Sequence, residues 1–160
     1  MIDALERSRI ELRRAEHLYY VSLKYTRTVD MIKNVIARLI TALEASIEAL
    51  IMQQVEKGTT DKIPELPRQK IDIIKKEYKD PYILEMVDFY TYLKTLDKAT
   101  HEDLKEYRRH VTMTAHTQEG DINVDIDKVG GYYQRTQWYL MHTHTICGQD
   151  EQQVTSTKHV

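Results

Sequence analysis

The sequence predicts an all-α fold, an up-and-down bundle of five to six helices, and three observations lead to this prediction. Apolar residues recur every three or four positions over long stretches, which is the period of an amphipathic helix. The 160 residues include only five glycines and three prolines, so few positions interrupt a helix. Charged residues make up 30% and hydrophobic residues 41%, which is typical of a globular chain with one core.

The helical period is clearest in the first part of the chain. Residues 3–27 predict a first helix, with a break near 26–28 where threonine hydroxyls can cap the next helix. Residues 29–57 predict a long central helix that ends at Gly58. Its apolar stripe comprises Ile32, Val35, Ile36, Leu39, Ile40, Leu43, Ile47, Leu50 and Ile51.

Three further helices are expected after a polar loop. Residues 67–78 predict a short basic helix that starts at a proline, and residues 81–97 predict another, capped by Asp80. The sequence Thr100-His101-Glu102-Asp103 resembles a capping box. It predicts a helix that continues through Tyr107 into the segment Arg109–His116.

The last part of the chain changes character before a closing helix. Residues 118–127 predict an extended loop or a short hairpin-like excursion, after which Asp127 caps the last helix. Gly130 and Gly131 lie inside that helix, where each costs about 1 kcal/mol relative to alanine. We expect one domain over residues 1–147 and a disordered tail over 148–160, which is polar and has no period.

Composition limits the classes of function. The net charge of −2 excludes a global basic field that would draw the protein onto nucleic acid, so such binding would need a local patch. A single cysteine, Cys147, excludes an internal disulfide and fits a reducing compartment, so we expect a cytoplasmic protein. The charged N-terminus is unlike a signal peptide, and no apolar run approaches the roughly 20 residues of a membrane span.

The candidate site lies in the segment Arg109–His116. On a helix, Arg109 and His116 are seven positions apart, about two turns, so both side chains would share one face. Arginine presents a fixed fork of donors that suits a phosphate, and histidine exchanges a proton near neutral pH. Together they are a minimal set of groups for phosphodiester chemistry. The structural alternative is that Arg109 bridges Glu106 or Asp103 and that His116 caps a helix end, in a non-enzymatic interaction or scaffold protein.

Two other residue sets invite a functional interpretation. His142, His144 and Cys147 carry metal-ligand groups, but histidines two positions apart on a helix point in different directions, so we assign no metal and no cofactor. The chain has eleven tyrosines but only one phenylalanine. They can be core-edge residues with hydrated hydroxyls, or stacking platforms for bases at the doublets Tyr19/Tyr20 and Tyr132/Tyr133.

The order of these elements resembles that of the HEPN family, the helical domains named from higher eukaryotes and prokaryotes nucleotide-binding proteins. The family motif is an arginine followed, after four to six residues, by a histidine, and Arg109 and His116 match it over a resemblance that spans most of residues 1–145. His110 occupies the polar place after the arginine. The resemblance implies a homodimer in which two Arg/His pairs share one cleft.

The same resemblance implies either a metal-independent, toxin-like endoribonuclease or a module that binds RNA or nucleotides. Many such proteins work beside a nucleotidyltransferase partner. In the enzyme reading, His116 acts as acid or base on a ribose 2′-hydroxyl or on the leaving 5′-oxygen. Arg109 holds the phosphate, and Lys105, Arg108 and His110 add phosphate contacts.

Overall fold

The fold is mixed α/β, because a three-stranded sheet interrupts the run of helices, so the all-α prediction is wrong. A computed structural model describes residues 1–148; the expected tail, apart from Gly148, lies outside the described residues. No helix within residues 1–148 has the length and apolar character needed to cross a membrane. The elements in chain order are α1 (Ile2–His17), a π-helical turn η1 (Leu18–Ser22), α2 (Leu23–Tyr25), α3 (Val29–Glu56), α4 (Pro67–Glu77), α5 (Pro81–Lys98), β1 (Thr100–Leu104), β2 (Thr112–Thr117), β3 (Gly120–Asp125) and α6 (Ile126–Ile146).

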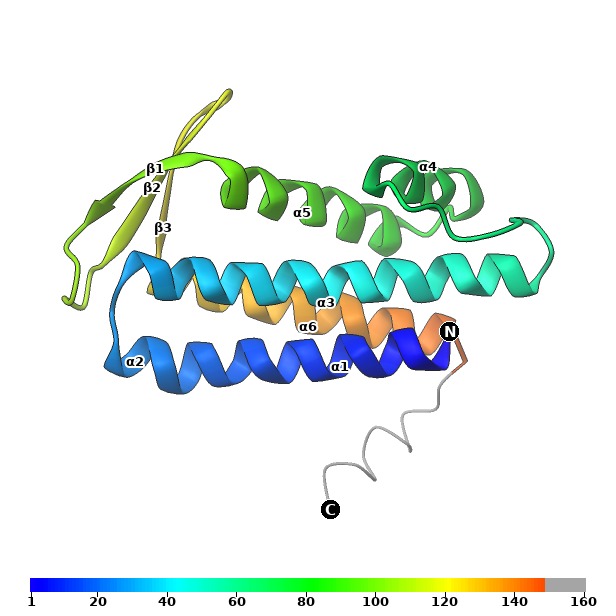
Figure 1. Ribbon diagram of the computed structural model, residues 1–160, viewed down its shortest axis with the longest axis horizontal. Coiled ribbons are helices and arrows are strands. Elements are labelled where there is room, and N and C mark those ends of the chain that lie inside the picture. Colours follow the sequence, from blue (N-terminus) through cyan, green and yellow to red (C-terminus); the bar gives the residue numbers. More distant parts are fainter. Residues whose placement is uncertain (149–160) are drawn as a thin grey trace, which may run out of the picture.

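Helix α3 runs through the middle of the bundle and packs against α1, α5 and α6 (Figure 1). This confirms the long central helix expected over residues 29–57. The Thr28 hydroxyl caps α3 by accepting a hydrogen bond from the backbone N–H of Met31 at 3.2 Å. Gly58, with a φ of 80°, follows the end of the helix in the left-handed conformation that glycine allows. Each leucine or isoleucine that α3 buries stabilises the bundle by about 1.5–3 kcal/mol.

The first glycine of the pair in α6 is explained by the π-helical turn that follows α1. The predicted first helix is divided there, and the turn places the Tyr19 ring against α6. A Cβ atom at Gly130 would lie 2.8 Å from Cζ of Tyr19 and closer still to its hydroxyl oxygen. A Cβ at Gly131 would meet nothing within 4 Å. The close approach of Tyr19 therefore requires the first glycine and not the second.

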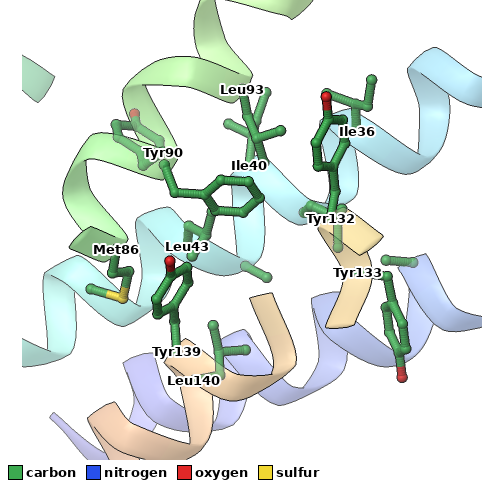
Figure 2. Close-up of a cluster of buried hydrophobic side chains, with 14 of the residues drawn as sticks. Ile36, Ile40, Leu43, Met86, Tyr90, Leu93, Tyr132, Tyr133, Tyr139 and Leu140 are labelled. Atoms are coloured by element: carbon green, nitrogen blue, oxygen red, sulfur yellow. The ribbon is translucent and has the colours of Figure 1, made fainter. Parts of the chain in front are cut away.

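The tyrosine doublet of α6 belongs to the core (Figure 2). Tyr132 and Tyr133 are only 5% and 4% exposed, and both hydroxyls have partners. The Tyr132 hydroxyl bonds that of Tyr92 at 2.6 Å, and the Tyr133 hydroxyl donates to Glu16 at 3.0 Å. Burial, together with the bond to Glu16, raises the pKa of Tyr133. The core-edge interpretation of this doublet is confirmed, and it offers no stacking platform.

The sheet occupies the segment that was expected to continue as a helix. Its order is β1-β2-β3 and both pairs are antiparallel, with Thr114 of β2 opposite Glu102 of β1 and Asn123 of β3. The helix expected from Thr100 into His116 is therefore wrong, whereas the hairpin-like excursion expected near residues 118–127 is present as β3. The alternation of residues 112–117 has the period of a strand, and threonine favours that backbone.

One face of the sheet packs on the bundle and the other does not. Met113 and Ala115 of β2 and Val124 of β3 are fully buried, and they share the face that covers the end of the bundle. The opposite face carries polar side chains, including that of His116, which is exposed. The side chain of Asp125, not that of Asp127, caps α6 by accepting from the Lys128 N–H at 2.8 Å.

Candidate nucleic-acid interface

Arg109 and His116 lie at opposite ends of strand β2. Arg109 is in the loop that joins β1 to β2, whereas His116 is next to the turn that leads into β3. Thr112 and His116 alone are separated by about 13 Å along the strand, and Arg109 lies beyond Thr112. The predicted shared helix face therefore does not exist, and one chain does not bring the two side chains together on a single phosphate.

The β1–β2 loop is anchored to the start of α3 by two contacts. The Tyr107 N–H donates to the Arg27 carbonyl oxygen at 2.6 Å. The Glu106 carboxylate accepts from the Val29 N–H at 3.2 Å and 3.4 Å through its two oxygens. This N–H is one of those that a helix start leaves without an intrahelical partner, and a carboxylate is favoured there. The loop is thus held against the segment between α2 and α3.

Two residues of this loop adopt a backbone conformation that L-residues rarely take. Lys105 has a φ of 56° and Tyr107 has a φ of 64°, and they are the only non-glycine residues with positive φ within residues 1–148. Such a conformation costs roughly 1 kcal/mol or more for a residue with a Cβ atom. The two anchoring contacts maintain it, which indicates that the position of the loop is defined rather than variable.

The β1–β2 loop and the segment between α2 and α3 lie at the same end of the molecule (Figure 1), and both segments carry cationic residues. We call this surface the basic tip; it consists of Lys24, Arg27, Lys105, Arg108 and Arg109. Within residues 1–148, none of the five side chains forms an ion pair. The exposed His110 adjoins them, and the Glu106 carboxylate of the same loop is directed to the start of α3. An acidic protein therefore presents a local positive surface.

Arginines of the bundle behave differently, because most of them are paired. Glu11 accepts from Arg14 at 2.6 Å and from Arg38 at 3.1 Å, which joins α1 to α3. Arg7 reaches Glu48 at 2.9 Å across the same helix pair. These guanidinium groups already have a carboxylate partner, whereas those of the basic tip can accept an anion from outside the chain.

His116 forms a pair with a carboxylate on the exposed face of the sheet. Its Nδ1 atom lies 2.8 Å from Oδ1 of Asp121, its cross-strand partner. The hydrogen bond to Asp121, followed by the charges of Asp121 and Glu102, raises the pKa of His116. The Nε2 atom has no hydrogen bond within residues 1–148, so this nitrogen is open to solvent. The surroundings of His116 are acidic, in contrast to those of Arg109.

The specific contacts of the structural alternative are also wrong. Glu106 caps α3 and Asp103 bonds Nδ1 of His101 at 2.5 Å, so neither carboxylate pairs with Arg109. His116 lies in a strand and caps no helix. Arg108, His110 and Lys105, predicted as additional phosphate contacts, do lie in the same loop as Arg109, and all are exposed.

His142, His144 and Cys147 diverge at the end of α6. The Nε2 atom of His142 contacts Asp80 at 2.7 Å and joins α6 to the start of α5. His144 is 5% exposed, and its Nδ1 donates to the Leu140 carbonyl at 2.7 Å. Burial raises the pKa of the Cys147 thiol to about 11. No group of three or more His, Cys, Asp or Glu side chains in residues 1–148 is arranged to hold a metal ion.

Two of the five residues of the basic tip were missed by the sequence analysis. Lys24 and Arg27 and the neighbouring Tyr25 were read only as the end of a helix, and Tyr107 as part of another. The signal was present in both segments, as Lys-Tyr-Thr-Arg at 24–27 and Tyr-Arg-Arg-His at 107–110. Basic residues interleaved with tyrosine are typical of nucleic-acid contacts. The hydrogen bonds from Tyr107 to Arg27 and from Val29 to Glu106 show that the two segments lie side by side.

Comparison with known proteins assigns no family to the chain. No family model, no curated protein and no solved structure matches it. The HEPN resemblance, with the homodimer and the nucleotidyltransferase partner that it implies, therefore stays a prediction.

Proposed function

We propose that this protein binds RNA through the basic tip. The observation that supports the proposal is the gathering of five cations without a carboxylate partner, within residues 1–148, at one end of a chain whose net charge is −2. The proposal agrees with the binding half of what the HEPN resemblance implies, but it does not require that resemblance. RNA is the ligand class because its backbone offers closely spaced phosphates to several cations at once.

The arrangement of the tip suits a chain of phosphates better than one isolated anion. The cations come from two segments, residues 24–27 and 105–109, which the hydrogen bond from Tyr107 to Arg27 holds together. All except the half-buried Arg27 are exposed, so they can contact more than one phosphate of a strand. Each contacted phosphate releases counterions, so binding through such a surface must weaken as salt rises.

The test is the binding of a labelled RNA strand at a series of salt concentrations, measured by fluorescence anisotropy. We expect wild-type protein to bind and the double variant Arg108→Glu/Arg109→Glu to lose affinity for RNA of any sequence. The dependence of log affinity on log salt should become shallower by about 0.7 for each phosphate contact that is lost.

The matched control is Lys75→Glu/Lys76→Glu. It makes the same change in net charge on exposed residues of α4, at the other end of the molecule (Figure 1). It should retain most of the affinity. Equal losses in the two variants would show that the basic tip is not the binding surface, and no binding by the wild-type protein would overturn the proposal.

A second candidate function is RNA cleavage, which the pairing of His116 with Asp121 favours. Asp121 orients the imidazole and leaves Nε2 open to take a proton from a ribose 2′-hydroxyl. The 2′-oxygen then bonds to phosphorus, the bond to the 5′-oxygen breaks, and the leaving 5′-oxygen receives a proton. No metal takes part in this reaction.

Cleavage by this route requires a cation near His116, which lies among Asp121 and Glu102 in its own chain. Arg109 of a second copy would have to supply it, so this candidate includes the predicted homodimer. We would incubate labelled single-stranded RNA with the protein in EDTA and compare wild type, His116→Ala and Asp121→Asn. Products with 2′,3′-cyclic phosphate ends that both variants fail to form would support it, and a wild-type dimer that binds RNA without cleaving it would exclude it.

A further inference from the structure

The two most exposed aromatic side chains of residues 1–148 both adjoin the basic tip. Tyr25 is 79% exposed and Tyr107 is 77% exposed, whereas Trp138, the next aromatic residue, is 58% exposed. Neither tyrosine has a side-chain hydrogen bond or a ring contact within the described residues. Most other tyrosines of the chain lie in the core or bond a neighbour through the hydroxyl. These two rings are therefore unusual in covering no other part of the protein.

Backbone contacts place the two tyrosines near each other although they are far apart in sequence. The Tyr107 N–H bonds the Arg27 carbonyl oxygen at 2.6 Å, and Tyr25 precedes Arg27 by two residues. Two residues of chain span at most about 7 Å. The backbones of both tyrosines therefore lie next to residues of the basic tip, close enough for one nucleic-acid strand to reach both residues.

The backbone conformation of the exposed Tyr107 is unfavourable, and contacts of the neighbouring residue hold it in place. Its φ of 64° is unfavourable for a residue with a Cβ atom, and the Glu106 carboxylate at the Val29 N–H holds the adjoining backbone in place. Exposed aromatic rings among unpaired cations are the combination that single-stranded nucleic acids bind.

We infer that the ligand of the basic tip is single-stranded RNA, whose unpaired bases stack on Tyr25 and Tyr107 while the cations hold the intervening phosphates. This inference rests on the proposed RNA binding. Every base has a flat face, so stacking on tyrosine tolerates any sequence. In a duplex these faces are covered by neighbouring base pairs, so a duplex could use the phosphate contacts alone. The tip should therefore prefer a single strand to a duplex.

The test separates the bases from the phosphates by comparing three labelled ligands of equal length. They are a single RNA strand, the same strand annealed to its complement, and an abasic strand that keeps the phosphates without the bases. Protein variants are Tyr25→Ala, Tyr107→Ala and the two corresponding phenylalanine substitutions. Alanine at position 107 keeps a Cβ atom at the same positive φ, so the backbone requirement of the loop is unchanged. Trp138→Ala, on the outer surface of α6, is the control for removing an exposed aromatic ring.

We expect each alanine substitution to weaken binding of the single RNA strand by about five- to 150-fold. Binding of the abasic strand and the salt dependence should stay at the wild-type level, and phenylalanine should restore affinity because it keeps the ring. Trp138→Ala should bind like wild type. Circular dichroism and thermal unfolding of each variant verify that the fold is retained.

The outcomes distinguish this inference from the proposal on which it rests. If the arginine variants lose binding while both tyrosine variants retain it, the basic tip binds phosphates and the stacking inference is wrong. Equal affinity for duplex and single strand would also overturn it. If no ligand binds wild-type protein, the proposed function itself fails, and a protein partner for the exposed tyrosines becomes the next hypothesis to test.

Discussion

The helical bundle and the sheet end with its basic tip differ in how far their side chains are buried and paired. In the bundle, apolar residues of α3 are fully buried, and Glu11 of α1 pairs with Arg14 of its own helix and with Arg38 of α3. At the sheet end, an edge strand exposes its one leucine, cations have no carboxylate partner within residues 1–148, and two tyrosines stand in solvent. Most buried apolar contacts thus lie in the bundle, whereas the sheet end presents clustered cations and two aromatic rings to solvent.

The largest expected effect compares one leucine from each region. Leu43 of α3 has no exposed surface, so Leu43→Ala should lower the free energy of unfolding by about 2–5 kcal/mol. Leu104 of β1 is 46% exposed, so Leu104→Ala should cost less than about 0.5 kcal/mol. Urea denaturation followed by circular dichroism measures both. Similar costs for the two substitutions would mean that the sheet end contributes to stability as much as the bundle does.

The two adjacent glycines of α6 should give changes of opposite sign. Gly130→Ala places a methyl group against the Tyr19 ring and should destabilise the protein by about 1–3 kcal/mol. Gly131→Ala meets open space and should stabilise it by up to roughly 1 kcal/mol, because alanine favours a helix. Thermal unfolding compares the two. Adding Tyr19→Ala to the Gly130→Ala variant should remove the overlap, and a failure of this rescue would mean that the destabilisation has another cause.

The smallest effect is a pair of opposite pH dependences. In the bundle, burial lowers the pKa of His144; the charge of Arg9 adds to this effect, whereas the hydrogen bond to the Leu140 carbonyl and the charge of Glu6 oppose it. As pH falls below about 6.5, the unfolded chain takes up a proton there that the folded chain does not, so stability decreases. At the sheet, the hydrogen bond to Asp121 raises the pKa of His116. The stability that protonated His116 gains from Asp121 is fully present below about pH 6.5. It is lost as pH rises through the raised pKa of the folded state.

NMR titration of the two imidazoles measures these shifts directly. His144→Gln should reduce the loss of stability in acid, and His116→Asn should remove the small gain. A His144 that titrates above the ordinary histidine value would show that its environment is not the buried one found at the end of α6. A His116 that titrates below that value would show that the contact with Asp121 does not form in solution.

Helices were predicted correctly where their apolar spacing and their end residues lie within the helix itself. The stripe along residues 29–57 repeats at three and four, Gly58 follows it, and the structure has α3 there. Asp80 and Pro81 likewise begin α5, because a cap and a proline act within a single turn. The same reasoning failed over residues 100–116. Thr100-His101-Glu102-Asp103 carries a helix-start pattern, but the chain pairs it with residues 113–116 as a strand.

The candidate site was predicted only in part, because only some of its residues are neighbours in the sequence. Lys105, Arg108, Arg109 and His110 are consecutive or nearly so, and their proximity follows from the sequence alone, whereas the sequence predicted a helix where the structure has an exposed loop. The expected partnership of Arg109 with His116 depended on a helical backbone, and on a strand the same spacing separates them. The contributions of Arg27 and Tyr25 were invisible, because nothing local links residues 25–27 to residue 107.

The sequence by itself determined the net charge of −2, against which a cluster of cations is unusual. It also determined the long helices and most of their ends. These features depend on backbone hydrogen bonds and apolar spacing within a few turns of chain. Tertiary structure alone decided that residues 100–125 form a sheet, that Gly130 accommodates Tyr19, and that two distant basic segments become one tip. The physical reason is that strand pairing and loop anchoring satisfy backbone groups through partners far away in sequence, and these partners appear only when the chain is folded.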